Sequence, residues 1–370
     1  MSRLEFESAA ELKACLEICQ DLSGAVFQSI DLTPFEESLR GVTLTHNVLL
    51  GCKTNESVLA LFDAPILLPT LPELPFNPFR ASLYSPEELL GDYQIGDADS
   101  YAQTLDGKIY DQFVDSGMAD ATDIYITLSR RLHDHGITDA LHEYLPKRKV
   151  VAIMGGHSML RSDPTYLEVA RLSRELVQAG YLPATGGGPG AMEATHLGAW
   201  FAERHDDELI DAVRMLSDAP LYKPRGPWLD AAFRVAKKYP LTSRDNCQSL
   251  GIPTWLYGHE PPSCFAVHIA KYFANSVREE GLLAIAKHGV VFSPGSAGTI
   301  QEIFQDACQN HYKSFGHESP MIFLGQKYWT ETKPVYPLLS QLADGQDYGR
   351  LIAITDSRLE VLRAIEKFTP

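Results

Sequence analysis

Short apolar runs alternate with helix-like segments from residue 147 to the end of the chain, and this alternation constrains the fold more than any other feature. The runs at 149–154 and 321–324 are short and aliphatic, as buried strands are. Between the runs, apolar residues recur every three or four positions, which indicates helices. A chain that alternates in this way forms a parallel sheet with helices on both faces. We therefore predict an α/β fold, with a Rossmann-like three-layer domain and a mostly parallel sheet over residues 147–370.

The individual elements follow from the same pattern. The predicted strands are 149–154, 181–185, 252–257, 289–292, 321–324 and 351–354. The predicted helices are 163–179, 190–204, 263–287, 300–312, 336–342 and 357–368. In the helix predicted over 263–287, His268, Lys271, Asn275 and Arg278 would form one polar stripe beside a buried one.

Three of the predicted strands end in glycine-rich turns. The turns are Gly155-Gly156-His157-Ser158, Gly186-Gly187-Gly188-Pro189-Gly190 and Pro294-Gly295-Ser296-Ala297-Gly298-Thr299. In a parallel sheet such turns lie at one edge, where free backbone N–H groups and helix dipoles bind anions. Each turn alone is equally well explained as a tight turn. Three in one sheet predict a site for a nucleotide or sugar phosphate.

Charged residues near these turns allow two interpretations. Glu302 lies one helical turn after the third glycine turn, where it can face the bound ligand or simply complement the helix dipole. Arg161 can bind phosphate or be a surface charge, and Glu193 follows the triple glycine at the start of a helix. The first turn lacks the Gly-x-Gly-x-x-Gly pattern, which disfavours NAD-dependent chemistry. The chain also has no Gly-x-x-x-x-Gly-Lys-Ser/Thr motif, which disfavours a P-loop NTPase.

The segments 185–194, reading T-G-G-G-P-G-A-M-E-A, and 294–302, reading P-G-S-A-G-T-I-Q-E, resemble the LOG (Lonely Guy) family, long labelled "lysine decarboxylase-like". Its members are Rossmann-like phosphoribohydrolases. The resemblance extends from about residue 147 to the C-terminus. It implies that Glu302 acts at the ribose, with Arg278 beside it. Ser296 departs from the family pattern, which has a second glycine at this position.

The resemblance implies hydrolysis of the N-glycosidic bond of a nucleoside 5′-monophosphate, purine or pyrimidine, to free base and ribose 5-phosphate. It implies no cofactor and no metal, and a homodimer or higher homo-oligomer. The expected catalytic residues are Glu302 and Arg278. The expected substrate-binding residues are Gly155, Gly156, Ser158, Arg161, Gly186, Gly187, Gly188, Gly190, Met192, Glu193, Pro294, Gly295, Ser296, Ala297, Gly298 and Thr299. The alternative is a sensor or regulatory protein that binds an NAD-derived or similar nucleotide without turnover.

The first 146 residues lie outside the resemblance. Phe27 and Leu32, and then Leu39, Leu44 and Leu49, are five residues apart, which suits a β-solenoid or, equally, a small β-meander. Six prolines between residues 63 and 86 predict an extended connector without strand or helix. We expect an N-terminal module with a Pro-rich connector over 1–99 and a helical connecting segment over 100–146, with helix stops near Gly117 and Gly136. The longer segment 201–251 is predicted to be either a lid or a helical excursion on the N-terminal module.

Charge and composition limit the partners. The net charge is −16 and the pI is near 5.2, which disfavours a protein that coats nucleic acid or anionic membranes. No apolar run approaches the roughly 20 residues of a membrane helix, and the first residues do not resemble a secretory signal. The six cysteines have no metal-site spacing. We expect a cytoplasmic protein that acts on a small nucleotide, without nucleic-acid or membrane partners.

Overall fold

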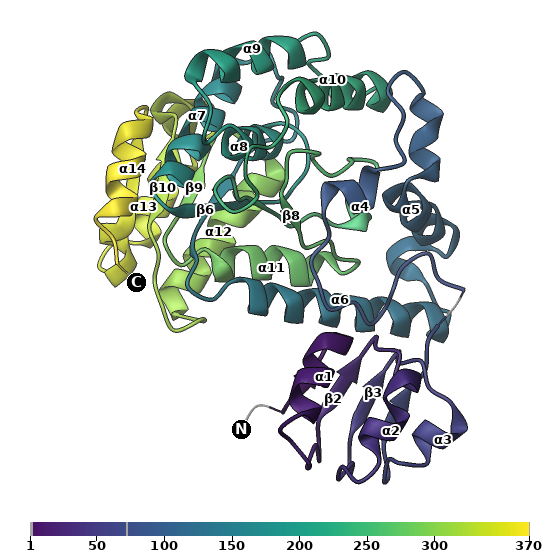
Figure 1. Cartoon of the computed structure of the whole chain (residues 1–370). Helices are drawn as coiled ribbons and strands as arrows, with labels where there is room; N and C mark the ends of the chain where they lie inside the picture. Colours follow the sequence, from purple (N-terminus) through teal and green to yellow (C-terminus); the bar gives the residue numbers. More distant parts are fainter. Residues whose placement is uncertain (1–2, 72, 370) are drawn as a thin grey trace. The chain divides into compact units, whose positions relative to one another are not determined.

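The computed structural model describes residues 3–71 and 73–369 (Figure 1). The chain forms two compact units, one of Met1–Leu83 with Asp120–Tyr144 and one of Tyr84–Ala119 with Leu145–Pro370. We call them the N-terminal unit and the sheet unit. This division differs from the predicted one, because residues 84–119 join the sheet unit and 120–144 join the N-terminal unit.

The sheet unit is built on seven parallel strands in the order β11-β10-β9-β5-β6-β7-β8, which confirms the predicted α/β, Rossmann-like fold. The strands are β5 (Lys149–Met154), β6 (Tyr181–Thr185), β7 (Leu250–Gly251), β8 (His268–Ile269), β9 (Val290–Phe292), β10 (Met321–Leu324) and β11 (Ile352–Thr355). The strand order reverses at β5, which pairs with β6 on one side and β9 on the other. Open α/β sheets bind ligands at the carboxyl ends of the strands beside such a reversal.

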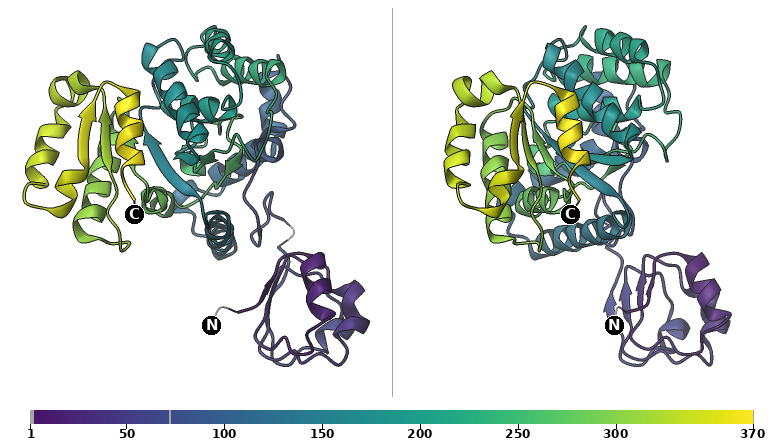
Figure 2. Two further views of the ribbon diagram at one scale, coloured as in Figure 1. Left: turned by 60° about the vertical axis from the view of Figure 1, so that its left-hand side comes forward. Right: turned by 90° about the vertical axis from the view of Figure 1, so that its left-hand side faces the viewer.

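Helices cover both faces of this sheet (Figure 2). Helices α7, α8 and α14 pack together on one face, and α11, α12 and α13 on the other. The α-helices of the sheet unit are α4 (Pro86–Leu90), α5 (Leu105–Asp115), α7 (Pro164–Gln178), α8 (Ala191–Trp200), α9 (Asp206–Leu216), α10 (Arg225–Lys238), α11 (Asn275–Ile285), α12 (Ala297–Tyr312), α13 (Val335–Leu342) and α14 (Arg358–Glu366). The short 3₁₀ elements are η2 (Ala98–Gln103), η4 (Trp255–Tyr257) and η6 (Asp347–Leu351), η5 (Tyr328–Thr332) is a π-helical turn, and η3 (Met118–Asp120) spans the boundary between the units.

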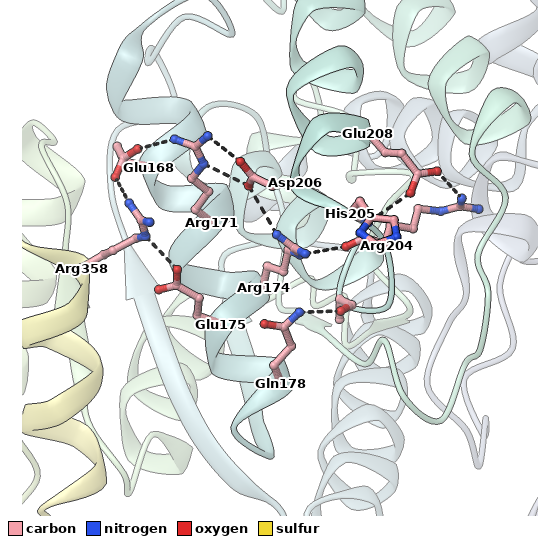
Figure 3. A network of polar contacts seen from close by, with 11 residues as sticks. Glu168, Arg171, Arg174, Glu175, Gln178, Arg204, His205, Asp206, Glu208 and Arg358 are labelled. Carbon is pink, nitrogen blue, oxygen red and sulfur yellow. Dashed lines mark hydrogen bonds and ion pairs between the residues drawn. The ribbon is translucent and has the colours of Figure 1, made fainter.

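Segment 201–251 is helical and packs on the sheet unit itself. Asp206 at the start of α9 pairs with Arg171 at 2.7 Å and Arg174 at 3.3 Å, both on α7 (Figure 3). Arg358 of α14 pairs with Glu168 and Glu175 of α7 at 2.7 and 2.8 Å. The network therefore holds α9, α7 and α14 together on the outer side of the sheet. Of the two predicted roles for this segment, the helical excursion is observed. Its helix α9 packs on α7, whereas α10 packs on residues 93–103, where Tyr93 Oη donates to Asp230 at 2.8 Å.

The helix predicted over 263–287 is wrong in its first half. Residues 268–269 form the edge strand β8, and α11 begins only at Asn275. His268 N–H and Ala270 N–H donate to the carbonyls of Ser249 and Gly251, so pairing with β7 outweighs the helical periodicity. Lys271 is therefore fully buried against Asp106 rather than part of a polar helix stripe. The strand predicted over 252–257 is also wrong, because β7 ends at Gly251 and Trp255–Tyr257 forms η4.

The N-terminal unit contains a second parallel sheet, in the order β1-β2-β3-β4. Its strands are β1 (Glu5–Phe6), β2 (Val26–Gln28), β3 (Val48–Leu50) and β4 (Ile66–Leu68), and its helices are α1 (Ala9–Leu16), η1 (Thr33–Phe35), α2 (Glu36–Leu39), α3 (Glu56–Leu59) and α6 (Ile124–Tyr144). Phe6, Phe27, Leu49 and Leu67 are in register across the four strands. Consecutive parallel strands make a solenoid, so the meander alternative is wrong.

Two further predictions for the N-terminal part need correction. β4 lies inside the proline-rich segment, with Pro65 before it and Pro69 after it, as suits an edge strand. The predicted stop near Gly117 is confirmed by the end of α5 at Asp115, but α6 continues through Gly136. A Cβ at Gly136 would lie 2.5 Å from the carbonyl oxygen of Arg80, so this glycine allows close packing rather than a turn. No helix among the described residues is long and apolar enough to cross a membrane.

Candidate functional site

The three glycine turns converge at the switch point of the sheet, as predicted. Gly156 N–H donates to the carbonyl of Pro294 at 3.0 Å, and Ala191 N–H donates to the carbonyl of Gly156 at 3.2 Å. The turn after β5 therefore contacts both of the others. Gly190 has a φ of 70°, and a Cβ there would lie 2.3 Å from the oxygen of Gly156. Only glycine allows this approach.

The turn after β9 leads directly into α12 and presents the amino end of that helix. Ser296 is the N-cap residue, but its side chain makes no capping hydrogen bond. A Cβ added to Gly298 would have no atom within 4 Å, so the turn is open at this point. Gly295 packs closely on the side chain of Thr299, which is buried. Uncapped N–H groups at the start of a 16-residue helix form a site suited to an anion.

An ammonium group also lies at this turn. Lys333 Nζ donates to Ser296 Oγ at 2.9 Å, and Tyr328 Oη donates to the carbonyl of Gly295 at 2.5 Å. Tyr328 is the first residue of η5, and Lys333 follows its last residue. Trp329 Nε1, in the same element, donates to the carbonyl of Phe292 at 3.1 Å and so fixes η5 beside β9. Within the described residues no carboxylate pairs with Lys333. No motif in the sequence pointed to this residue, which lies 37 positions after Ser296.

Arg278 and Glu302, the two expected catalytic residues, are brought together. Arg278 Nε donates to the carbonyl of Ile252 at 2.7 Å, and Nη1 lies 3.8 Å from Glu302 Oε1. The guanidinium lies against Gly186, where a Cβ would be 2.1 Å from Nη2. Burial raises the pKa of Glu302 to about 7, although Arg278 acts to lower it. A buried carboxyl group beside an arginine, with a pKa raised in this way, is typical of catalytic sites.

A second carboxyl group follows Glu302 one helical turn later. Asp306 is 2% exposed, and its Oδ2 has no hydrogen-bond partner among the described residues. Burial raises its pKa well above the ordinary value. Burial therefore disfavours the charged form of this carboxyl group beside Glu302.

Arg161 and Glu193, both expected to bind substrate, instead bind each other in the core. Their side chains are each 1% exposed and are joined by two hydrogen bonds, of 2.8 and 2.5 Å. Tyr166 Oη donates to Glu193 at 2.9 Å, and Arg161 Nη1 donates to the carbonyls of Ala219 and Trp228. The hydrogen-bonding groups of this pair are thus engaged within the protein. The structure gives the two residues a packing role that the sequence did not predict.

The triple-glycine turn borders a carboxylate that the sequence did not single out. Glu260 Oε2 lies 3.3 Å from the position of a Cβ on Gly188, and Met192 touches both Gly188 and Gly186. His157, after β5, has its Nδ1 3.9 Å from Glu260 Oε1. Gly187 packs on Pro253 below the turn. The expected residues Ser158 and Ala297 are exposed, on the turn after β5 and at the start of α12, and within the described part of the chain Ser158 Oγ makes no hydrogen bond to another site residue.

No family model and no curated protein sequence matches the chain. Among solved structures, the molybdenum cofactor carrier protein of Chlamydomonas reinhardtii aligns with 14% identity and a TM-score of 0.38, over 60% of this chain and 98% of its own. The molybdenum cofactor binding protein of Rippkaea orientalis aligns with 15% identity and a TM-score of 0.35, over 60% of this chain and 97% of its own. A likeness at this level does not bear on function.

Proposed function

We propose that this protein hydrolyses the N-glycosidic bond of a nucleoside 5′-monophosphate and releases free base and ribose 5-phosphate. The observation that carries the proposal is the meeting of Glu302 with Arg278 beside an open, anion-binding turn at the switch point of the sheet. The motif resemblance to the LOG family supports the same reaction.

In the proposed reaction, the 5′-phosphate binds the N–H groups of the turn 295–299, next to Lys333. The ionised Glu302 accepts hydrogen bonds from ribose hydroxyls and stabilises positive charge at C1′ as the bond to the base breaks. The bonding electrons leave with the base nitrogen, which takes up a proton. A water oxygen then adds to C1′ and loses a proton. Arg278, whose guanidinium lies between Glu302 and Gly186, would contact the ribose beside Glu302.

The pH dependence of hydrolysis should report Glu302. Because the carboxylate form is the active one and its pKa is raised to about 7, kcat/KM should rise with pH through about 7 and level off above it. Initial rates between pH 4 and 9 test this. An inflection near 4.5, the ordinary value for glutamate, or a rate that falls between pH 6 and 8, would contradict the assignment.

Lys333 should contribute to binding of the phosphate. Lys333→Met removes one charge-assisted hydrogen bond, so KM for a nucleoside monophosphate should rise about tenfold with little change in kcat. Lys327→Met is the matched control, because Lys327 is exposed and six residues away in the sequence. Equal KM values for the two variants would show that Lys333 is only a surface lysine.

The proposed function is tested by comparing each of AMP, GMP, CMP and UMP with its unphosphorylated nucleoside. Base release from at least one of the monophosphates, and much slower release from its nucleoside, is the expected result. Tight binding of a nucleotide without base release would favour the alternative of a sensor. Equal rates with and without phosphate would contradict the assignment of the turn 295–299.

A further inference from the structure

Glu260 is a largely buried carboxylate beside the triple-glycine turn. Its side chain is 14% exposed, and two imidazoles lie within ion-pair distance of it. His157 Nδ1 and His259 Nε2 each lie 3.9 Å from Oε1, which is too long for a hydrogen bond. Burying a carboxylate without such partners is costly. The two acceptor oxygens are therefore available for a ligand that supplies N–H or O–H donors.

The position of Glu260 relates it to the proposed substrate. Its Oε2 borders Gly188. The side chain of Met192 lies against both Gly188 and Gly186. The guanidinium of Arg278 also lies against Gly186. In the proposed complex the phosphate occupies the turn 295–299 and the ribose lies at Glu302. The base then extends from C1′ along the triple-glycine turn, toward Glu260.

The side chains of Glu260 and His157 together favour one base over the others. A carboxylate offers two acceptors side by side, and the neighbouring imidazole of His157 can offer one donor. Guanine presents the complementary row on its pairing edge, with O6 as acceptor and N1–H and N2–H₂ as donors. Adenine, cytosine and uracil each place an acceptor, N1, N3 or a carbonyl oxygen, beside their N–H donor. That acceptor would face a carboxylate oxygen and be repelled.

We infer that Glu260 is the residue that recognises the base, and that it selects guanine nucleotides by accepting hydrogen bonds from N1–H and N2–H₂. This inference rests on the proposed function for the placement of the ribose and phosphate. Glu260 acts on specificity and takes no part in the breaking of the glycosidic bond.

The test measures binding in a background that does not turn over, so that it does not depend on hydrolysis. In the Glu302→Gln protein, calorimetry should show GMP bound at least about tenfold more tightly than AMP, CMP or UMP. IMP, which lacks the 2-amino group, should be intermediate. Adding Glu260→Gln replaces one acceptor by a donor and should weaken GMP binding about 10- to 100-fold, with little effect on AMP. Glu366→Gln, at an exposed position on α14, is the matched control and should change none of these values.

The outcomes separate the two proposals. A GMP preference that depends on Glu260, found in a wild-type protein that releases no base, would support the inference and contradict the proposed hydrolysis. Hydrolysis of all four nucleotides, with no GMP preference or with an equal effect of Glu260→Gln on each, would overturn the inference and leave the proposed function standing. A failure of all four nucleotides to bind would overturn both.

Discussion

Glu302→Gln should reduce hydrolysis by about two to four orders of magnitude, the scale typical of losing a positioned catalytic group. Glutamine has nearly the same shape, so packing against Arg278 is kept. An amide cannot supply the negative charge that stabilises C1′ as the base departs. Folding and nucleotide binding should therefore stay nearly intact while kcat falls. Chromatography of the free base over time measures the rate, and calorimetry measures the binding.

The neighbouring residue provides the control for this substitution. Gln301 is exposed and donates to Glu279 at 2.9 Å, on the outer side of α12. Gln301→Ala should change kcat by much less than Glu302→Gln. If Glu302→Gln turned over substrate at the wild-type rate, the carboxylate would be a helix-end charge and the proposed mechanism would be wrong.

Glu193→Ala should lower the free energy of unfolding of the sheet unit by about 3–5 kcal/mol, because it leaves the buried charge of Arg161 without its partner. Glu193→Gln, which keeps the volume but not the charge, should also be strongly destabilising. All four tryptophans, Trp200, Trp228, Trp255 and Trp329, lie in the sheet unit. Tryptophan fluorescence during urea unfolding of the full chain therefore reports this unit.

An exposed ion pair supplies the comparison. Asp347 pairs with Lys313 at 3.1 Å at the surface, and Asp347→Asn should destabilise the protein far less than either Glu193 variant, because water screens an exposed pair. A loss of less than about 1 kcal/mol for both Glu193 variants would show that the buried pair is not a structural element. It would also reopen the substrate-binding role that the sequence suggested for Arg161 and Glu193.

The central strands could be predicted from the sequence because they are buried on both faces. β5, β6 and β10 begin and end at the predicted residues, since a strand covered by helices is a continuous apolar run between polar turns. The edge strand β8 could not. Phe265, Ile269 and Phe273 recur every four residues, as in a helix, and all three are buried. Hydrogen bonds to β7 decide the conformation there, and they are invisible to local periodicity.

The same distinction applies to the site. The glycine turns and Glu302 stand in contiguous motifs, so local sequence identifies them. The partners that decide the role of a charged residue come from distant segments. Glu193 is 32 residues from Arg161, Lys333 is 37 from Ser296, and Glu260 faces a turn that ends 70 residues earlier at Gly190. No local sign in the sequence distinguishes an arginine paired in the core from a lysine that has no acidic partner among the described residues.

The most direct test of the central claim is to detect ribose 5-phosphate by mass spectrometry after incubating the wild-type protein with the four common nucleoside 5′-monophosphates. We expect many molecules of ribose 5-phosphate per protein chain, formed in equal number with the free base from at least one of the four. Release of inorganic phosphate and nucleoside instead, or no product from any of them, would contradict the account.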